Sequence, residues 1–137
     1  MNVMLTSDET AAYTAYQTGD LDFIDSIPTE EIASVKDSSE FVVLDNLGTY
    51  YSAFNYNSDL YANLGLDEEQ AKTFRRAISL MIDRQYIIDT IGQLDQQIAT
   101  TFVPAGCSDG NGGEFKNKDY FSTDYDTNVA EAKDLLA

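Results

Sequence analysis

The sequence predicts an α/β fold of the mixed α+β kind, with a partial mixed sheet flanked by helices. Segments with helical periodicity alternate along the chain with short segments rich in β-branched and aromatic residues. The resulting order, helix–strand–helix–strand–strand–helix–helix–strand–helix, indicates a mixed α/β domain. A length of 137 residues suits one compact domain, so we predict a single domain over residues 1–137.

The first predicted helix is followed by a predicted strand. Residues 7–19 form the helix, with Ser7 as its N-cap and Gly19 at its C-terminal end. Residues 20–27 alternate between apolar and polar side chains, which predicts a short strand. Pro28 ends this strand because proline cannot donate a backbone hydrogen bond.

A second helix and two more strands are predicted next. Thr29 is the expected N-cap of a helix over residues 29–37. The apolar run FVVL at residues 41–44 is typical of a strand that is buried on both faces. Residues 50–57 alternate sharply, which predicts a further strand, and residues 58–66 are predicted to form a loop.

The strongest helix signal in the chain begins at Asp67. Asp67 and Gln70 have the spacing of a capping box, with Asp in place of the usual Ser or Thr. An apolar stripe follows at positions i, i+3, i+4, i+7 and i+8: Phe74, Ala77, Ile78, Met81 and Ile82. Asp83 is predicted to end this helix and to cap another one, which Gly92 stops.

The last part of the chain is predicted to contain a strand, a long loop and a helix. Residues 98–104 are strand-like, residues 105–118 form a glycine-rich surface loop, and residues 127–137 form the final helix. This helix reaches the end of the chain without the Gly, Asn or Pro that commonly stops a helix. We therefore expect the sequence to be a fragment of a longer protein.

The basic residues are unevenly distributed. The chain has eight Lys or Arg residues against 24 Asp or Glu residues. Half of the basic residues fall in and around the predicted helix after Asp67: Lys72, Arg75, Arg76 and Arg84. They either form a solvated helix face with i,i+4 ion pairs or contact an anion or a partner, and the sequence leaves both interpretations open.

The composition argues against several function classes. A net charge of −16 disfavours binding to nucleic acid or to an anionic membrane surface. The chain has no histidine and a single cysteine, Cys107, so neither an enzyme nor a cofactor is expected. The loop SDGNGGE at residues 108–114 resembles a calcium loop, but Gly113 and Tyr120 stand where the EF-hand pattern requires ligands, so no metal site is expected.

The tyrosine-rich strand over residues 50–57 is the best candidate for a binding surface. Tyr50, Phe54 and Tyr56 share one predicted face, which is most simply the core of a sheet. Tyr51 and Asn55 share the opposite face. An aromatic ring beside an amide can hold a polar ligand by stacking and directed hydrogen bonds.

Five phrases in the same order resemble the extracytoplasmic solute-binding proteins of ABC transporters, in the oligopeptide- and dipeptide-binding family. They are AAYTAYQTGDLDFIDSIP, GTYYSAFN, FRRAISLMIDRQYII, TTFVPAG and YDTNVAEAKDLLA. The resemblance covers nearly the whole chain, and only residues 58–73 and the loop at 107–118 fit less well. It implies a periplasmic-binding-protein-like fold, with residues 1–137 as a fragment of the second of two lobes.

The resemblance also implies a function. The parent protein would capture peptides outside the cytoplasmic membrane and deliver them to an ABC permease. It would be periplasmic, or a cell-surface lipoprotein anchored through a parent N-terminus that is absent here. Tyr51 is then the first candidate for a ligand contact, followed by Tyr50 and Asn55, and the fragment is expected to be a monomer. The alternatives are a sugar or nickel cargo, or a free-standing, non-catalytic interaction module.

Overall fold

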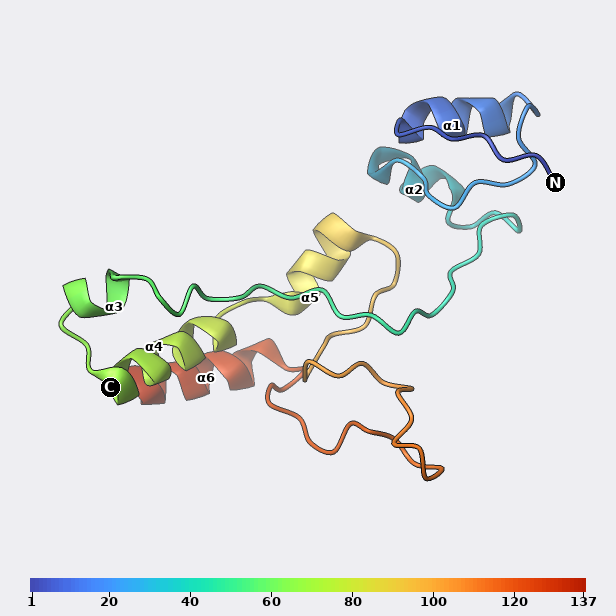
Figure 1. Cartoon of the computed structure of the whole chain (residues 1–137). Helices are drawn as coiled ribbons and strands as arrows, with labels where there is room; N and C mark the ends of the chain where they lie inside the picture. Colours follow the sequence, from blue (N-terminus) through green and yellow to red (C-terminus); the bar gives the residue numbers. More distant parts are fainter.

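The computed structural model describes residues 1–137 as a set of helices joined by long irregular segments (Figure 1). The helices are α1 (Glu9–Gln17), α2 (Thr29–Val35), α3 (Leu60–Asn63), α4 (Glu68–Leu80), α5 (Arg84–Ile87), the π-helix η1 (Ile88–Gly92) and α6 (Tyr125–Leu136). The only β-type pairing is one isolated antiparallel bridge between Ser108 and Glu114. None of the helices combines the length and apolar character that crossing a bilayer requires.

The predicted mixed α/β fold with a mixed sheet flanked by helices is wrong for this structure, because no sheet forms. All four segments predicted as strands, residues 20–27, 41–44, 50–57 and 98–104, lack strand structure. A strand needs a neighbouring strand for its backbone hydrogen bonds and a packed face for its side chains. Leu44, from the apolar run expected to be buried on both faces, is 82% exposed.

The local signals for the two ends of α1 are confirmed to within a residue. At the end of α1, Gly19 has a φ of 80°. Its N–H donates to the Tyr16 carbonyl at 3.0 Å, and the N–H of Asp20 donates to the Ala15 carbonyl at 2.9 Å. This pair of bonds is the Schellman arrangement. The N-cap of α1 is Asp8 rather than Ser7, since the Asp8 carboxylate accepts from the Ala11 N–H at 3.0 Å.

The start of α2 is also shifted by one residue. Thr29 is the first helical residue, so the prediction that it caps the helix is wrong. Pro28 holds the N-cap position and provides no side-chain cap. Its buried ring and its φ of −52° lead the chain directly into the helix.

Helix α4 begins with the predicted capping box. The Gln70 N–H donates to the Asp67 carboxylate at 2.8 Å, and the Asp67 N–H donates to the Gln70 side chain at 3.0 Å. Asp83 caps the next helix as predicted, because its carboxylate accepts from the Tyr86 N–H at 2.9 Å. This helix is short and widens into η1, which ends at Gly92.

The main packed unit of the molecule consists of α4 and α6, which lie side by side (Figure 1). Its core contains Ala77, Leu80 and Ala132, with Phe121 packed against them. The face of α4 that is buried differs from the predicted apolar stripe by a rotation about the helix axis. Leu80, which was outside the stripe, is completely buried, whereas Met81 is 50% exposed.

Candidate functional site

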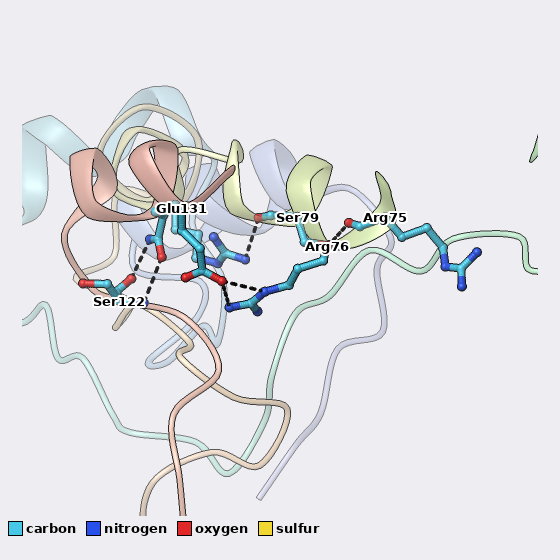
Figure 2. Close-up of polar contacts among 7 residues, drawn as sticks. Arg75, Arg76, Ser79, Ser122 and Glu131 are labelled. Atoms are coloured by element: carbon cyan, nitrogen blue, oxygen red, sulfur yellow. Dashed lines mark hydrogen bonds and ion pairs between the residues drawn. The ribbon is translucent and has the colours of Figure 1, made fainter. Parts of the chain in front are cut away.

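Two of the clustered arginines hold Phe121 against the α4–α6 unit. The Cζ atoms of Arg76 and Arg84 lie 4.8 Å and 4.0 Å from the centre of the Phe121 ring. Arg76 also donates through Nε and Nη2 to one carboxylate oxygen of Glu131 on α6, at 3.2 Å and 2.8 Å (Figure 2). These contacts join residues that are 55 positions apart in the sequence.

Arg84 also closes the C-terminal end of α4. Its guanidinium donates to the carbonyls of Ser79 and Ile82 at 3.1 Å and 3.2 Å, where the end of a helix leaves carbonyl oxygens without partners. Burial, followed by the positive charge of Arg76, lowers the pKa of Arg84 from its ordinary value. Arg76 and Arg84 therefore form neither a free solvated face nor a vacant anion site.

A buried asparagine completes this unit. Asn128 on α6 is 3% exposed. Its Oδ1 accepts from the Ser122 N–H at 2.9 Å, and its Nδ2 donates to the Ser122 carbonyl at 2.8 Å. Figure 2 shows Ser122 on the segment that leads into α6. The amide thus replaces both hydrogen bonds that water would otherwise make with the Ser122 backbone.

Arg75 faces away from its two arginine neighbours. In Figure 2 its side chain points away from Arg76 and Glu131. The hydrogen bond drawn at Arg75 runs from the Ser79 hydroxyl to the Arg75 backbone carbonyl and does not involve the guanidinium. The Arg75 Cζ lies 4.9 Å from the centre of the Tyr56 ring and 5.0 Å from that of the Tyr61 ring. Arg75 forms no salt bridge and donates no side-chain hydrogen bond within the chain.

The predicted ligand residues lie on the irregular segment before α3. Tyr50 is fully exposed and Tyr51 is 67% exposed, so the structure does not place Tyr50 in a sheet core. Asn55 is exposed as well, and its Oδ1 accepts from the Asn57 N–H at 3.1 Å in a local turn. No hydrogen bond or ring contact joins Tyr50, Tyr51 and Asn55 to one another.

Tyr51 is instead paired with an aromatic residue that the sequence did not single out. The rings of Tyr51 and Phe102 have centroids 5.0 Å apart and an interplanar angle of 67°, an edge-to-face arrangement. Phe102 is itself 64% exposed. Nearby, a Cβ atom added at Gly106 would lie 3.3 Å from the Leu47 side chain, so the two segments pass close to each other. Phe102 lies in the phrase TTFVPAG and in the predicted strand over residues 98–104, but neither pattern indicates a contact with Tyr51.

One surface hollow lies away from these tyrosines. A shallow, mainly apolar depression beside the ends of α4 and α6 is lined by Met81, Val129 and Leu136, among others. The glycine-rich loop uses its carboxylate internally, since Asp109 accepts from the N–H groups of Asn111 at 2.7 Å and Gly113 at 3.0 Å. These backbone hydrogen bonds lower the pKa of Asp109.

The whole chain matches a known family. Residues 1–137 match the family described as bacterial extracellular solute-binding proteins, family 5 Middle. Dipeptide-binding protein DppE of Bacillus subtilis (strain 168) is 24% identical over 112 residues, which cover 82% of this chain and 19% of the relative. Oligopeptide-binding protein OppA of the same strain is 28% identical over 111 residues, which cover 76% of this chain and 19% of the relative. No solved structure matches the chain significantly.

Proposed function

Because the chain belongs to family 5 of the bacterial extracellular solute-binding proteins, we propose that it is part of a protein that captures peptides for an ABC transporter. The single observation that carries this proposal is the family match over residues 1–137, together with two relatives named for dipeptide and oligopeptide binding. The chain covers about a fifth of the length of these relatives, 19% in both cases. Capture and delivery are therefore assigned to the whole protein.

In this proposal residues 1–137 belong to the second lobe of a two-lobed protein. The lobes close on a peptide by a hinge, outside the cytoplasmic membrane, and the loaded protein then docks on a membrane permease. The protein is either periplasmic or a lipoprotein at the cell surface. The family and both relatives are binding proteins rather than enzymes.

The ligand contacts are proposed to come from Tyr51 first, with Tyr50 and Asn55 beside it. The exposure of both tyrosine rings supports this choice, because a peptide can reach them without any rearrangement of the chain. Tyrosine offers a large contact area at a small cost in side-chain entropy. The edge of the exposed Phe102 ring adds apolar surface next to Tyr51. Peptide binding through main-chain hydrogen bonds and a few such contacts would give loose side-chain selection.

The first test is to express the parent protein and identify what purifies with it. Native mass spectrometry followed by denaturing release would detect the bound molecules. A mixture of short peptides is the expected result. A sugar, a metal ion, or an empty protein that also ignores added peptides would overturn the proposed cargo.

The second test concerns Tyr51. We expect Tyr51→Ala in the parent protein to weaken peptide affinity and to leave the melting temperature nearly unchanged, since the ring is 67% exposed. Tyr86→Ala is the matched control, because Tyr86 is 62% exposed and lies on α5 rather than on the tyrosine-rich segment. Isothermal titration with the released peptides measures both variants. An unchanged affinity for Tyr51→Ala would remove this residue from the site.

A further inference from the structure

Arg75 and Arg76 are adjacent in sequence, but their side chains contact different parts of the molecule. Successive residues of a helix point about 100° apart, so neighbouring side chains leave α4 in different directions. Arg76 turns towards α6 and pairs with Glu131. Arg75 turns towards the segment that precedes α4, where it meets the rings of Tyr56 and Tyr61.

The partners of Arg75 are aromatic in a chain that is rich in carboxylates. The chain carries 24 Asp and Glu residues, yet the Arg75 guanidinium forms no salt bridge. Lys72, one turn earlier on α4, does pair with a carboxylate, that of Glu69 at 3.3 Å. A guanidinium about 5 Å from two ring centres is attracted by both ring faces and is weakly hydrated, which suits it to this position.

These contacts fix one end of the proposed ligand-binding segment. Tyr56 directly follows Asn55, and its hydroxyl also donates to the Glu68 carboxylate on α4 at 3.4 Å. Tyr61 is buried at 9% exposure, and its ring gives Arg75 a second contact surface. The other end of the segment is held where Tyr51 meets Phe102. The backbone between Tyr51 and Asn55 makes no regular pairing of its own, so these end contacts decide where its side chains lie.

We propose that Arg75 is a positioning residue that holds the tyrosine segment, residues 50–57, against helix α4. The proposal rests on the proposed function, in that residues of this segment contact the peptide. Arg75 itself does not touch the peptide. It acts by keeping Tyr56, and therefore Asn55 and Tyr51, in a fixed place relative to α4.

The test uses the parent protein and its variants Arg75→Ala, Arg75→Lys and Lys72→Ala. Lys72→Ala is the matched control, because it removes one positive charge from the same helix without removing a ring contact. Affinity is measured for trialanine and for its C-terminal amide. In parallel, the ligand-free proteins are treated with a low dose of chymotrypsin, and mass spectrometry follows cleavage after four residues of the segment: Tyr50, Tyr51, Phe54 and Tyr56.

We expect Arg75→Ala to weaken binding of both peptides by the same factor, about 5- to 30-fold if two cation–π contacts are lost. Cleavage within the segment should accelerate by a similar factor, since protease attack follows local opening. Arg75→Lys should recover part of both effects, because lysine keeps the charge but not the planar stacking surface. Lys72→Ala should change neither.

Three outcomes would overturn the positioning role. A loss confined to the free-acid peptide would mean that Arg75 contacts the peptide carboxylate directly. Equal effects of Arg75→Ala and Lys72→Ala would reduce the role to general charge, and unchanged cleavage would show that Arg75 does not hold the segment. If the wild-type parent binds neither trialanine, its amide nor any co-purified peptide, the proposed function fails. The cleavage rates alone then decide whether Arg75 holds the segment.

Discussion

Replacing Asn128 with alanine tests whether one buried amide holds the entry to α6. The substitution leaves the N–H and the carbonyl of Ser122 without the partners that they have at 2.9 Å and 2.8 Å. An unsatisfied buried group costs about 1–3 kcal/mol. Ser122 is only half-buried, so water can partly replace the amide, and we take the lower half of that range for each group. The expected loss in the free energy of unfolding is therefore about 2–4 kcal/mol.

Urea unfolding of the 137-residue chain, followed by circular dichroism at the helical signal, measures this loss. The matched control is Asn117→Ala, because Asn117 is exposed and its side chain makes no hydrogen bond. We expect the control to change the free energy of unfolding by less than about 0.5 kcal/mol. The loss is a large fraction of the stability of a chain in which only 11 of 137 residues are buried. Equal unfolding midpoints for the two variants would refute the reasoning.

Two further predictions concern the same unit. Leu80→Ala should cost about 2–5 kcal/mol of unfolding free energy in the same urea experiment, because Leu80 is completely buried between α4 and α6. Leu64→Ala, at a 53% exposed leucine, should cost less than about 0.5 kcal/mol, and similar losses for both would place the core elsewhere. Hydrogen bonds from the side chain and then the N–H of Thr127 lower the pKa of Asp124, the N-cap of α6. A lowered folded pKa gives stability that is present at neutral pH and is lost as the pH falls through that value. The wild type should therefore exceed Asp124→Asn in stability at pH 7, by a margin that shrinks below about pH 4; a margin that is constant with pH would contradict this.

Several helix ends could be predicted because the signals that decide them lie within a few residues. Asp67 and Gln70 form their capping box from four consecutive residues, and Asp83 caps α5 in the same way. Gly19 ends α1 because its φ of 80° is easily reached only without a side chain. The errors at Ser7 and Thr29 are single-residue shifts between neighbouring residues that can both begin a helix.

The strands could not be predicted in the same way, because a strand depends on partners that lie elsewhere. The run FVVL has high β-propensity, but this propensity describes how well a residue fits a packed sheet surface. In the structure no such surface meets residues 41–44, and Leu44 remains exposed. The same applies to the alternation over residues 50–57. The prediction of a core face and a solvent face requires a sheet, and no sheet forms. Tyr50, which the alternation places on the core face, is therefore fully exposed.

For the candidate site, the sequence identified the segment but not its contacts. The aromatic and amide residues of residues 50–57 are visible in the sequence, and the prediction of Tyr51, Tyr50 and Asn55 as ligand contacts remains a prediction. The Tyr51–Phe102 contact joins residues 51 positions apart, and no local sequence pattern predicts it. Arg75 was visible only as one member of a charged cluster, and its two tyrosine partners follow from the path of the chain before α4.

The arginines cluster near α4 because a guanidinium can stack on aromatic rings and hydrogen-bond to carboxylates and carbonyls of segments that are distant in sequence. Each arginine has a partner within the chain. Arg76 contacts Glu131 and Phe121, and Arg84 contacts backbone carbonyls and the same Phe121 ring. Arg75 contacts two tyrosine rings of the chain before and within α3. Lysine offers neither a planar stacking surface nor a fixed fork of donors. The Arg76–Glu131 pair is only partly buried, so as an ion pair it contributes about 1 kcal/mol or less. Its role is to fix the register of α4 against α6, with the apolar core of Leu80 supplying most of the stability of the contact.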